Sequence, residues 1–111
     1  MTEATFRKLA LELPGATEGS HMGHPDFRVG GKIFATLLSP EPGWGMVALT
    51  PDEQELFVHA APAVFVPAKG GWGRQGSTNV RLSGATTTVV RDALLAAWKR
   101  RAPRALLDED E

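Results

Sequence analysis

Two consecutive glycines, Gly30 and Gly31, separate a short apolar run at residues 27–29 from a longer one at 32–38. A two-residue hairpin turn of the primed type requires positive φ angles, which glycine adopts without the steric cost of a Cβ. The pattern therefore predicts a β-hairpin whose strands are these two runs. Strands joined by so tight a turn run antiparallel, which favours an antiparallel sheet.

The rest of the chain alternates between helix and strand patterns. Thr50, Pro51 and Glu53 give the clearest local signal, a capping box with proline at the first helical position. The expected elements are helices at 2–13, 51–59 and 86–101, strands at 44–49, 64–66 and 79–82, and loops at 15–26, 39–43 and 68–77. This order predicts an α+β fold, a single domain with an antiparallel β-sheet and helices packed on it.

A chain of 111 residues is long enough for one domain with one core. We expect this domain to span residues 1–107 and the acidic residues 108–111 to form a disordered tail. The predicted core consists of Phe6, Leu9, Leu13, Phe27, Ile33, Phe34, Val47, Leu49, Leu56, Phe65, Val80, Leu94 and Trp98.

The composition excludes several classes of protein. The chain has no cysteine, which rules out disulfides and thiolate chemistry. No stretch of about 18 apolar residues offers a membrane span, and the first residues lack the basic and apolar regions of a signal peptide. We therefore expect a cytoplasmic protein with no membrane association and no cofactor, and we favour a monomer.

The net charge of −1 hides an uneven distribution along the chain. Residues 56–107 carry eight Lys or Arg and a single acid, Asp92, whereas residues 108–111 are all acidic. A basic half is compatible with a polyanionic partner such as DNA. It is equally compatible with a solvated surface beside a solubilising tail.

Residues 71–76 match the G-x-G-x-x-G spacing of dinucleotide-binding loops. Such a loop opens a helix, whereas here the following residues, 77–82, have the pattern of a strand, so we reject that function. The glycines instead predict a tight hairpin tip that presents Trp72 and Arg74 outward, next to Lys69. The alternative is that Trp72 folds back over the sheet and Arg74 is simply solvated.

Five blocks of the sequence resemble the MmcQ/YjbR-like family in order and spacing. They are LELPGATEG at 11–19, HPDFRVGGKIFATL at 24–37, LTPDEQELF at 49–57, FVPAKGGWG at 65–73 and AWKRRAPRAL at 97–106. The resemblance covers roughly residues 4–107, and FRVGGKIFA and AWKRRAP are its most specific parts. It implies a compact α+β domain related to the CyaY-like arrangement.

The resemblance also implies a double-wing mode of DNA binding, in which two loops beside the sheet reach for the duplex. The first wing would be the hairpin that carries Arg28 and Lys32. The second wing would be the glycine-rich loop with Lys69, Trp72 and Arg74, followed by Arg81. The acidic tail departs from the family pattern, and it can mask a basic face and so oppose DNA binding.

Other chemistry is less well supported by the sequence. Glu18, His21, His24 and Asp26 lie close together in a predicted loop, and H-x-x-H with flanking carboxylates can bind a divalent metal. Two imidazoles without an obvious third side-chain ligand make an incomplete site, so we expect no metal. No serine lies in a nucleophile elbow, and we expect no enzymatic activity.

A second hypothesis is a module that binds a small molecule or a protein at the sheet and the glycine-rich loop. The positions of the eight bases distinguish the two hypotheses. Bases gathered on one face with Arg28 and Lys32 would favour DNA. Scattered bases and a closed apolar pocket under Trp72 would favour the module that binds a small molecule or a protein.

Overall fold

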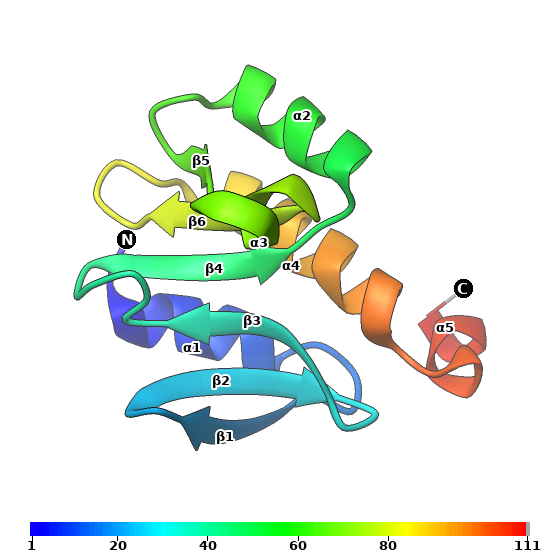
Figure 1. Ribbon diagram of the computed structural model, residues 1–111. Helices are drawn as coiled ribbons and strands as arrows, with labels where there is room; N and C mark the ends of the chain where they lie inside the picture. The colour runs from blue at the N-terminus through cyan, green and yellow to red at the C-terminus, as the bar shows by residue number, and fades with distance from the viewer. Residues whose placement is uncertain (111) are drawn as a thin grey trace.

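The computed structural model describes residues 1–110, with side chains described to Leu107, and forms a six-stranded antiparallel sheet (Figure 1). The strand order is β1-β2-β3-β4-β6-β5. The strands are β1 (Thr17–His21), β2 (His24–Val29), β3 (Lys32–Leu37), β4 (Trp44–Ala48), β5 (Phe65–Pro67) and β6 (Ser77–Arg81). The helices are α1 (Glu3–Leu11), α2 (Pro51–Ala60), α3 (Gly70–Arg74), α4 (Thr87–Arg101) and α5 (Arg104–Asp110). The predicted α+β fold class is therefore confirmed.

The strongest local signals in the sequence produce the expected structures. Gly30 and Gly31 have φ angles of 59° and 79° and join β2 to β3, as a primed turn requires. Thr50 Oγ1 accepts a hydrogen bond from Glu53 N at 3.1 Å, and Thr50 N donates to Glu53 Oε1 at 2.9 Å. This capping box fixes the start of α2.

The hydrophobic core lies between the sheet and the helices α1 and α4. Of the predicted members, Leu13 and Ile33 are only partly buried. Leu56 was predicted wrongly, because its side chain is 70% exposed. Its neighbour Phe57 instead turns toward the sheet and packs against Phe65, with ring centroids 5.3 Å apart. The other predicted core residues are buried: Phe6, Leu9, Phe27, Phe34, Val47, Leu49, Phe65, Val80, Leu94 and Trp98.

Two predicted loops contain regular structure. Residues 15–26 hold β1 and the start of β2, which pair antiparallel from Thr17 opposite Arg28 to His21 opposite His24. β1 is an outer strand with exposed or half-exposed residues throughout, so it lacks the apolar alternation that marks a half-buried strand. The expected loop at 68–77 contains the short helix α3.

The predicted domain boundary at residue 107 lies inside the last helix. The backbone of α5 continues to Asp110, through the start of the segment expected to be a disordered tail. The side chains of 108–110 and all of Glu111 lie outside the described residues, so the disorder stays a prediction. No helix in the described part of the chain has the length and apolar character needed to cross a membrane.

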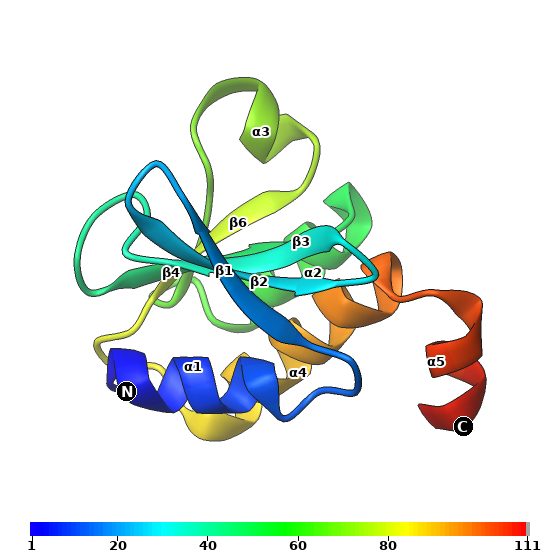
Figure 2. The same ribbon diagram turned by 90° about the horizontal axis from the view of Figure 1, so that it is seen from below.

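The two faces of the sheet have different surroundings. α1 and α4 cover one face, and α3 lies on the opposite side together with the tip of the β1–β2 hairpin (Figure 2). Successive side chains in a strand point to opposite faces. Met46 on β4 pairs with Thr36 on β3 and with Asn79 on β6, so these three residues share the face that α3 partly covers. We call it the open face.

Candidate functional site on the open face of the sheet

Hydrogen bonds from one glutamine and the close packing of two glycines position α3 above the open face. The Gln54 side-chain amide donates to the carbonyl oxygens of Gly73 at 3.0 Å and Ser77 at 3.1 Å, and lies 3.2 Å from Thr78 Oγ1. An added Cβ on Gly73 would overlap the carbonyl of Ala68, and one on Gly76 would overlap the carbonyl of Leu49. The glycines therefore allow the backbone in and after α3 to pack closely against neighbouring backbone.

A pocket of about 600 Å³ lies between α3, the open face and the β1–β2 hairpin tip. This volume is in the range of sites that hold small molecules. Ile33, Met46 and Ala48 supply apolar surface, and Trp72 lines the pocket from α3. We call this site the open-face pocket.

Three residues that line the open-face pocket have a buried polar atom without a hydrogen-bond partner in the described part of the protein. These atoms are Thr36 Oγ1, His24 Nδ1 and Arg101 Nε. Thr36 is only 4% exposed. Buried polar groups in folded proteins are almost always paired, so three unpaired groups around one cavity distinguish this place from the rest of the molecule.

The lining of the open-face pocket is cationic. Lys69 and Arg101 supply its positive charge, and no Asp or Glu is among its described lining residues. Neither Lys69 nor Arg101 forms an ion pair with any residue whose side chain is described. Burial, with a smaller effect from the neighbouring charge of Arg100, lowers the pKa of Arg101. The pocket thus holds positive charge that no ion pair balances among the side chains described, those of residues 1–107.

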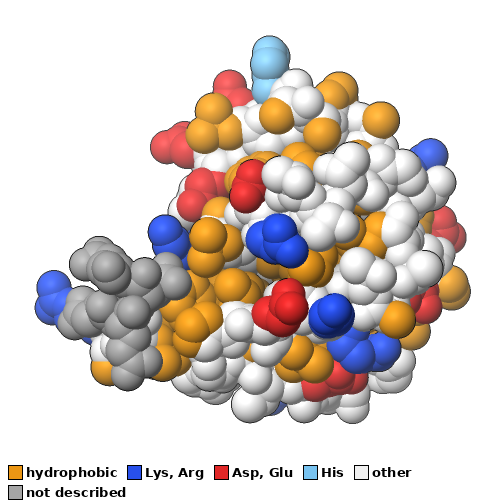
Figure 3. Space-filling view, turned by 180° about the vertical axis from the view of Figure 1, so that it is seen from behind, with side chains coloured by type: hydrophobic (Ala, Val, Ile, Leu, Met, Phe, Trp, Pro, Cys, Tyr) orange, Lys and Arg blue, Asp and Glu red, His pale blue; other side chains and the backbone are white. Residues whose placement is uncertain are grey.

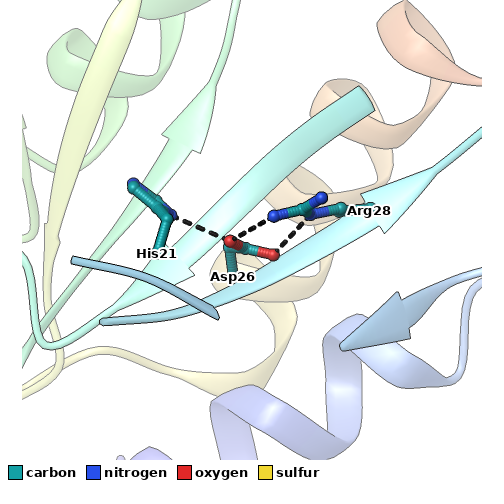
Figure 4. Close-up of polar contacts among 3 residues, drawn as sticks. All are labelled: His21, Asp26 and Arg28. Carbon is teal, nitrogen blue, oxygen red and sulfur yellow. Dashed lines mark hydrogen bonds and ion pairs between the residues drawn. The ribbon is translucent and has the colours of Figure 1, made fainter. Parts of the chain in front are cut away.

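A polar cluster of His21, Asp26 and Arg28 borders this region on β1 and β2 (Figure 4). Arg28 Nε and Nη2 donate to Asp26 Oδ1 at 2.8 Å and Oδ2 at 3.0 Å, and His21 Nδ1 lies 2.8 Å from Oδ2. The hydrogen bonds from Arg28 hold the pKa of Asp26 below its ordinary value of 3.8, against the opposing effect of burial, and His21 lowers it further. Asp26 itself is completely buried.

Three of the four residues considered as metal ligands, Glu18, His21 and Asp26, have other partners. Both oxygens of Asp26 are taken by Arg28 and His21, and Glu18 Oε1 accepts from Arg7 Nε at 3.0 Å. Among the described residues, no three His, Asp or Glu side chains come together as a metal site would require. The open-face pocket therefore offers donors and cations, which suit an anion.

Two of the predicted binding residues meet at the open-face pocket. Lys69 caps α3 and Trp72 lies one turn into it, and both line the pocket. Trp72 is 73% exposed, so the alternative that it covers the sheet as a core residue is wrong. Arg74 ends α3 and is exposed, away from the lining residues.

The other predicted binding residues are separate from one another. Arg28 pairs in register with Ile33, whereas Lys32 pairs with the buried Val29, so the two cations of the hairpin lie on opposite sides of the sheet. Arg81 is on β6, which β3 and β4 separate from β2, and its guanidinium carbon is 5.5 Å from the centre of the Trp44 ring. The hairpin therefore does not present a single basic face.

The most informative residues of the pocket were not predicted as a site. Arg101 lies in the last turn of α4, where a solvated cation is favourable anyway, so its sequence position does not mark a site. Thr36 is one hydroxyl within an apolar strand pattern, and nothing local distinguishes it. The KRR run at 99–101 was the available signal, but only the fold shows that Arg101 lines the pocket while Arg100 donates to the Leu49 carbonyl at 3.1 Å.

An antiparallel sheet covered by helices on one face and open around a pocket on the other defines a small α+β domain with an open-faced site. The chain belongs to the YjbR family, whose model matches residues 11–100. This confirms the resemblance seen in the sequence.

A solved structure supports the same fold. The crystal structure of Deinococcus radiodurans protein DR2400, with a DUF419 domain, superposes with a TM-score of 0.75 at 19% sequence identity. The match covers 97% of this chain and 86% of that one. No curated protein matches the sequence.

Proposed function

We propose that this domain recognises a small molecule in the open-face pocket and that its role is binding rather than catalysis. The observation that carries the proposal is the group of three buried polar atoms around the cavity, Thr36 Oγ1, His24 Nδ1 and Arg101 Nε. Leaving one such group unpaired costs about 1–3 kcal/mol. A ligand that pairs with them would offset this cost, which supports a site built for a partner.

The pocket can be tested by a fragment screen followed by two-dimensional NMR on the labelled protein. We expect bound fragments to shift the backbone amide signals of Thr36, Met46 and Asn79, which come from three adjacent strands. Met46→Trp fills the cavity from its floor and is expected to abolish these shifts. Leu56→Trp is the matched control, since Leu56 is an exposed residue outside this pocket.

Melting temperatures of both variants establish that they are folded. Fragment shifts that persist in folded Met46→Trp, or that fall elsewhere on the surface, would contradict the proposal.

A second candidate is the double-wing DNA binding implied by the family resemblance. One observation favours it: Trp72 is 73% exposed on a helix that also carries Arg74 and follows Lys69. The distribution of charge favours it less. Arg28 and Lys32 lie on opposite sides of the sheet, and the formal net charge is −1. The face away from α3 offers no continuous basic surface either, since Lys and Arg are interspersed there with Asp and Glu (Figure 3).

Salt-dependent DNA titrations of two variants test this candidate. Arg74→Ala removes one possible phosphate contact and should reduce the slope of log K against log salt by about 0.9. Trp72→Ala should cost about 1–3 kcal/mol of affinity with the slope unchanged, because it removes a stacking surface. Since Trp72 is exposed, the melting temperature of Trp72→Ala should stay close to that of the parent protein. Absence of a gel shift at low salt would eliminate this candidate.

A further inference from the structure

We propose that the ligand of the open-face pocket is an aromatic anion, with its charged group bound by Arg101 and Lys69 and its ring stacked on Trp72. The inference rests on the proposed function, since it names the class of molecule that the same pocket binds. It also commits to one chemistry, a flat ring that carries a phosphate or a carboxylate.

The charge of the ligand follows from the lining. A buried charge is costly unless it is paired, and Arg101 has a buried Nε without a partner among the described residues. Lys69 adds a second cation, and no carboxylate lines the described part of the pocket to balance either one. A guanidinium matches phosphate and carboxylate groups through two parallel hydrogen bonds. The hydroxyl of Thr36 can donate one more.

The aromatic part follows from the three tryptophans. Trp98 is fully buried and its Nε1 donates to the Pro14 carbonyl at 2.8 Å, while Trp44 lies under the Arg81 guanidinium. Trp72 is the largest of the exposed hydrophobic side chains in the described residues, and it lines the pocket. An indole on a rigid helix offers a flat face on which a planar ring can stack.

The apolar floor supports the same class of ligand. Ile33, Met46 and Ala48 come from neighbouring strands and present no charge to the cavity. A ring that lies against this floor and under Trp72 would leave its anionic substituent to reach Lys69 or Arg101. A small inorganic anion would use the cations and leave the apolar surface without a partner.

Two matched pairs of compounds test the charge and identify its source. Adenosine 5′-monophosphate and adenosine differ by a phosphate, and indole-3-acetate and indole-3-acetamide differ by a carboxylate charge. Each compound is titrated into the full chain by calorimetry and by NMR that observes the indole N–H signals. We expect the charged member of at least one pair to bind about tenfold or more tightly than its neutral partner. The indole signal of Trp72 should shift, and that of Trp98 should not.

Variants assign the parts of the ligand to residues. Arg101→Gln should remove most of the difference in affinity between the charged and neutral members of a pair. Arg101→Lys should restore part of this difference, because lysine returns the charge but lacks the parallel N–H donors of a guanidinium. Trp72→Ala should weaken both members of a pair by a similar factor. Lys99→Gln is the control, since Lys99 is an exposed cation near the same helix end and outside the pocket lining.

The outcomes separate this inference from the proposed function. Equal affinity for charged and neutral members, or equal loss in Arg101→Gln and Lys99→Gln, overturns the anionic ligand and leaves a small-molecule site. Charged compounds that bind while Trp72→Ala has no effect overturn the aromatic part. If neither pair binds below about 1 mM and fragments still bind at Thr36 and Met46, the inference is wrong and the proposed function stands. If no fragment binds there either, both fail.

Discussion

Replacement of Gly76 by alanine is expected to destabilise the domain by about 3 kcal/mol or more, with a fall in melting temperature on the order of 10 °C. Gly76 has a φ of 111°, which residues with a side chain rarely adopt, and an added Cβ would overlap the Leu49 carbonyl. The backbone fixes the position of the Cβ and the atom that it meets is a backbone oxygen, so no side-chain rotation relieves the clash. Gly73→Ala should be similarly damaging, because its Cβ would overlap the Ala68 carbonyl.

Gly71 provides the matched control within the same helix. An added Cβ there would meet only the end of the Arg74 side chain, at 3.6 Å. Gly71→Ala should therefore leave stability unchanged or raise it by up to about 1 kcal/mol, since alanine favours helix over glycine. Chemical denaturation of the three variants measures the difference. Equal stability of Gly71→Ala and Gly73→Ala would show that α3 does not pack against Ala68 as described, and equal stability of Gly71→Ala and Gly76→Ala would contradict the close approach of Gly76 to Leu49.

Arg28→Ala is expected to lower the melting temperature by several degrees at pH 7, and this loss should shrink in acid. Without Arg28, the buried Asp26 carboxylate keeps His21 as its remaining side-chain partner. The folded-state pKa of Asp26 is depressed below 3.8, so its ion pair stabilises the protein above that pH and is lost as the pH falls through the lowered folded value. The curves of parent and variant should therefore converge below pH 3.8.

Thermal melts between pH 7 and pH 2 measure this convergence, and a carbon-detected titration of Asp26 should show its pKa raised in the variant. Lys32→Ala is the control, an exposed cation of the same hairpin with no ion pair among the described side chains. A difference between parent and Arg28→Ala that is independent of pH would assign the loss to packing alone.

Much of the fold was predictable because its signals are local. The Gly30–Gly31 turn and the capping box at Thr50 depend on backbone geometry within a few residues, and both form as expected. The core positions of α4 follow helical spacing, and Leu94 and Trp98 are buried. These features need no knowledge of distant contacts.

The errors lie where tertiary contacts decide the structure. β1 is polar along its whole length, and its place in the sheet comes from pairing with β2. Leu56 fits the apolar pattern of α2, but the helix packs on Phe57 instead. α3 forms from a glycine-rich sequence with poor helix propensity because Gln54 bonds to it and glycine permits the close approach.

The sequence predicted only part of the candidate site. The glycine-rich stretch at 71–76 pointed to Lys69 and Trp72, which line the open-face pocket. Thr36, Met46 and Asn79 come from three strands that the strand order places side by side, and Arg101 joins them from the end of α4. Unpaired buried atoms are a property of three-dimensional packing, and no spacing rule predicts them.

Because side chains alternate along the strands, the positions that line the open-face pocket are different from the positions that form the core. β4 gives Val47 to the core and Met46 to the pocket, and β6 gives Val80 to the core and Asn79 to the pocket. Under the proposed function, substitutions on one set of alternating positions would change the compound that is bound while the other set keeps the domain folded. A mutant library restricted to the pocket positions of β3, β4 and β6 should therefore yield new specificities among variants that still fold.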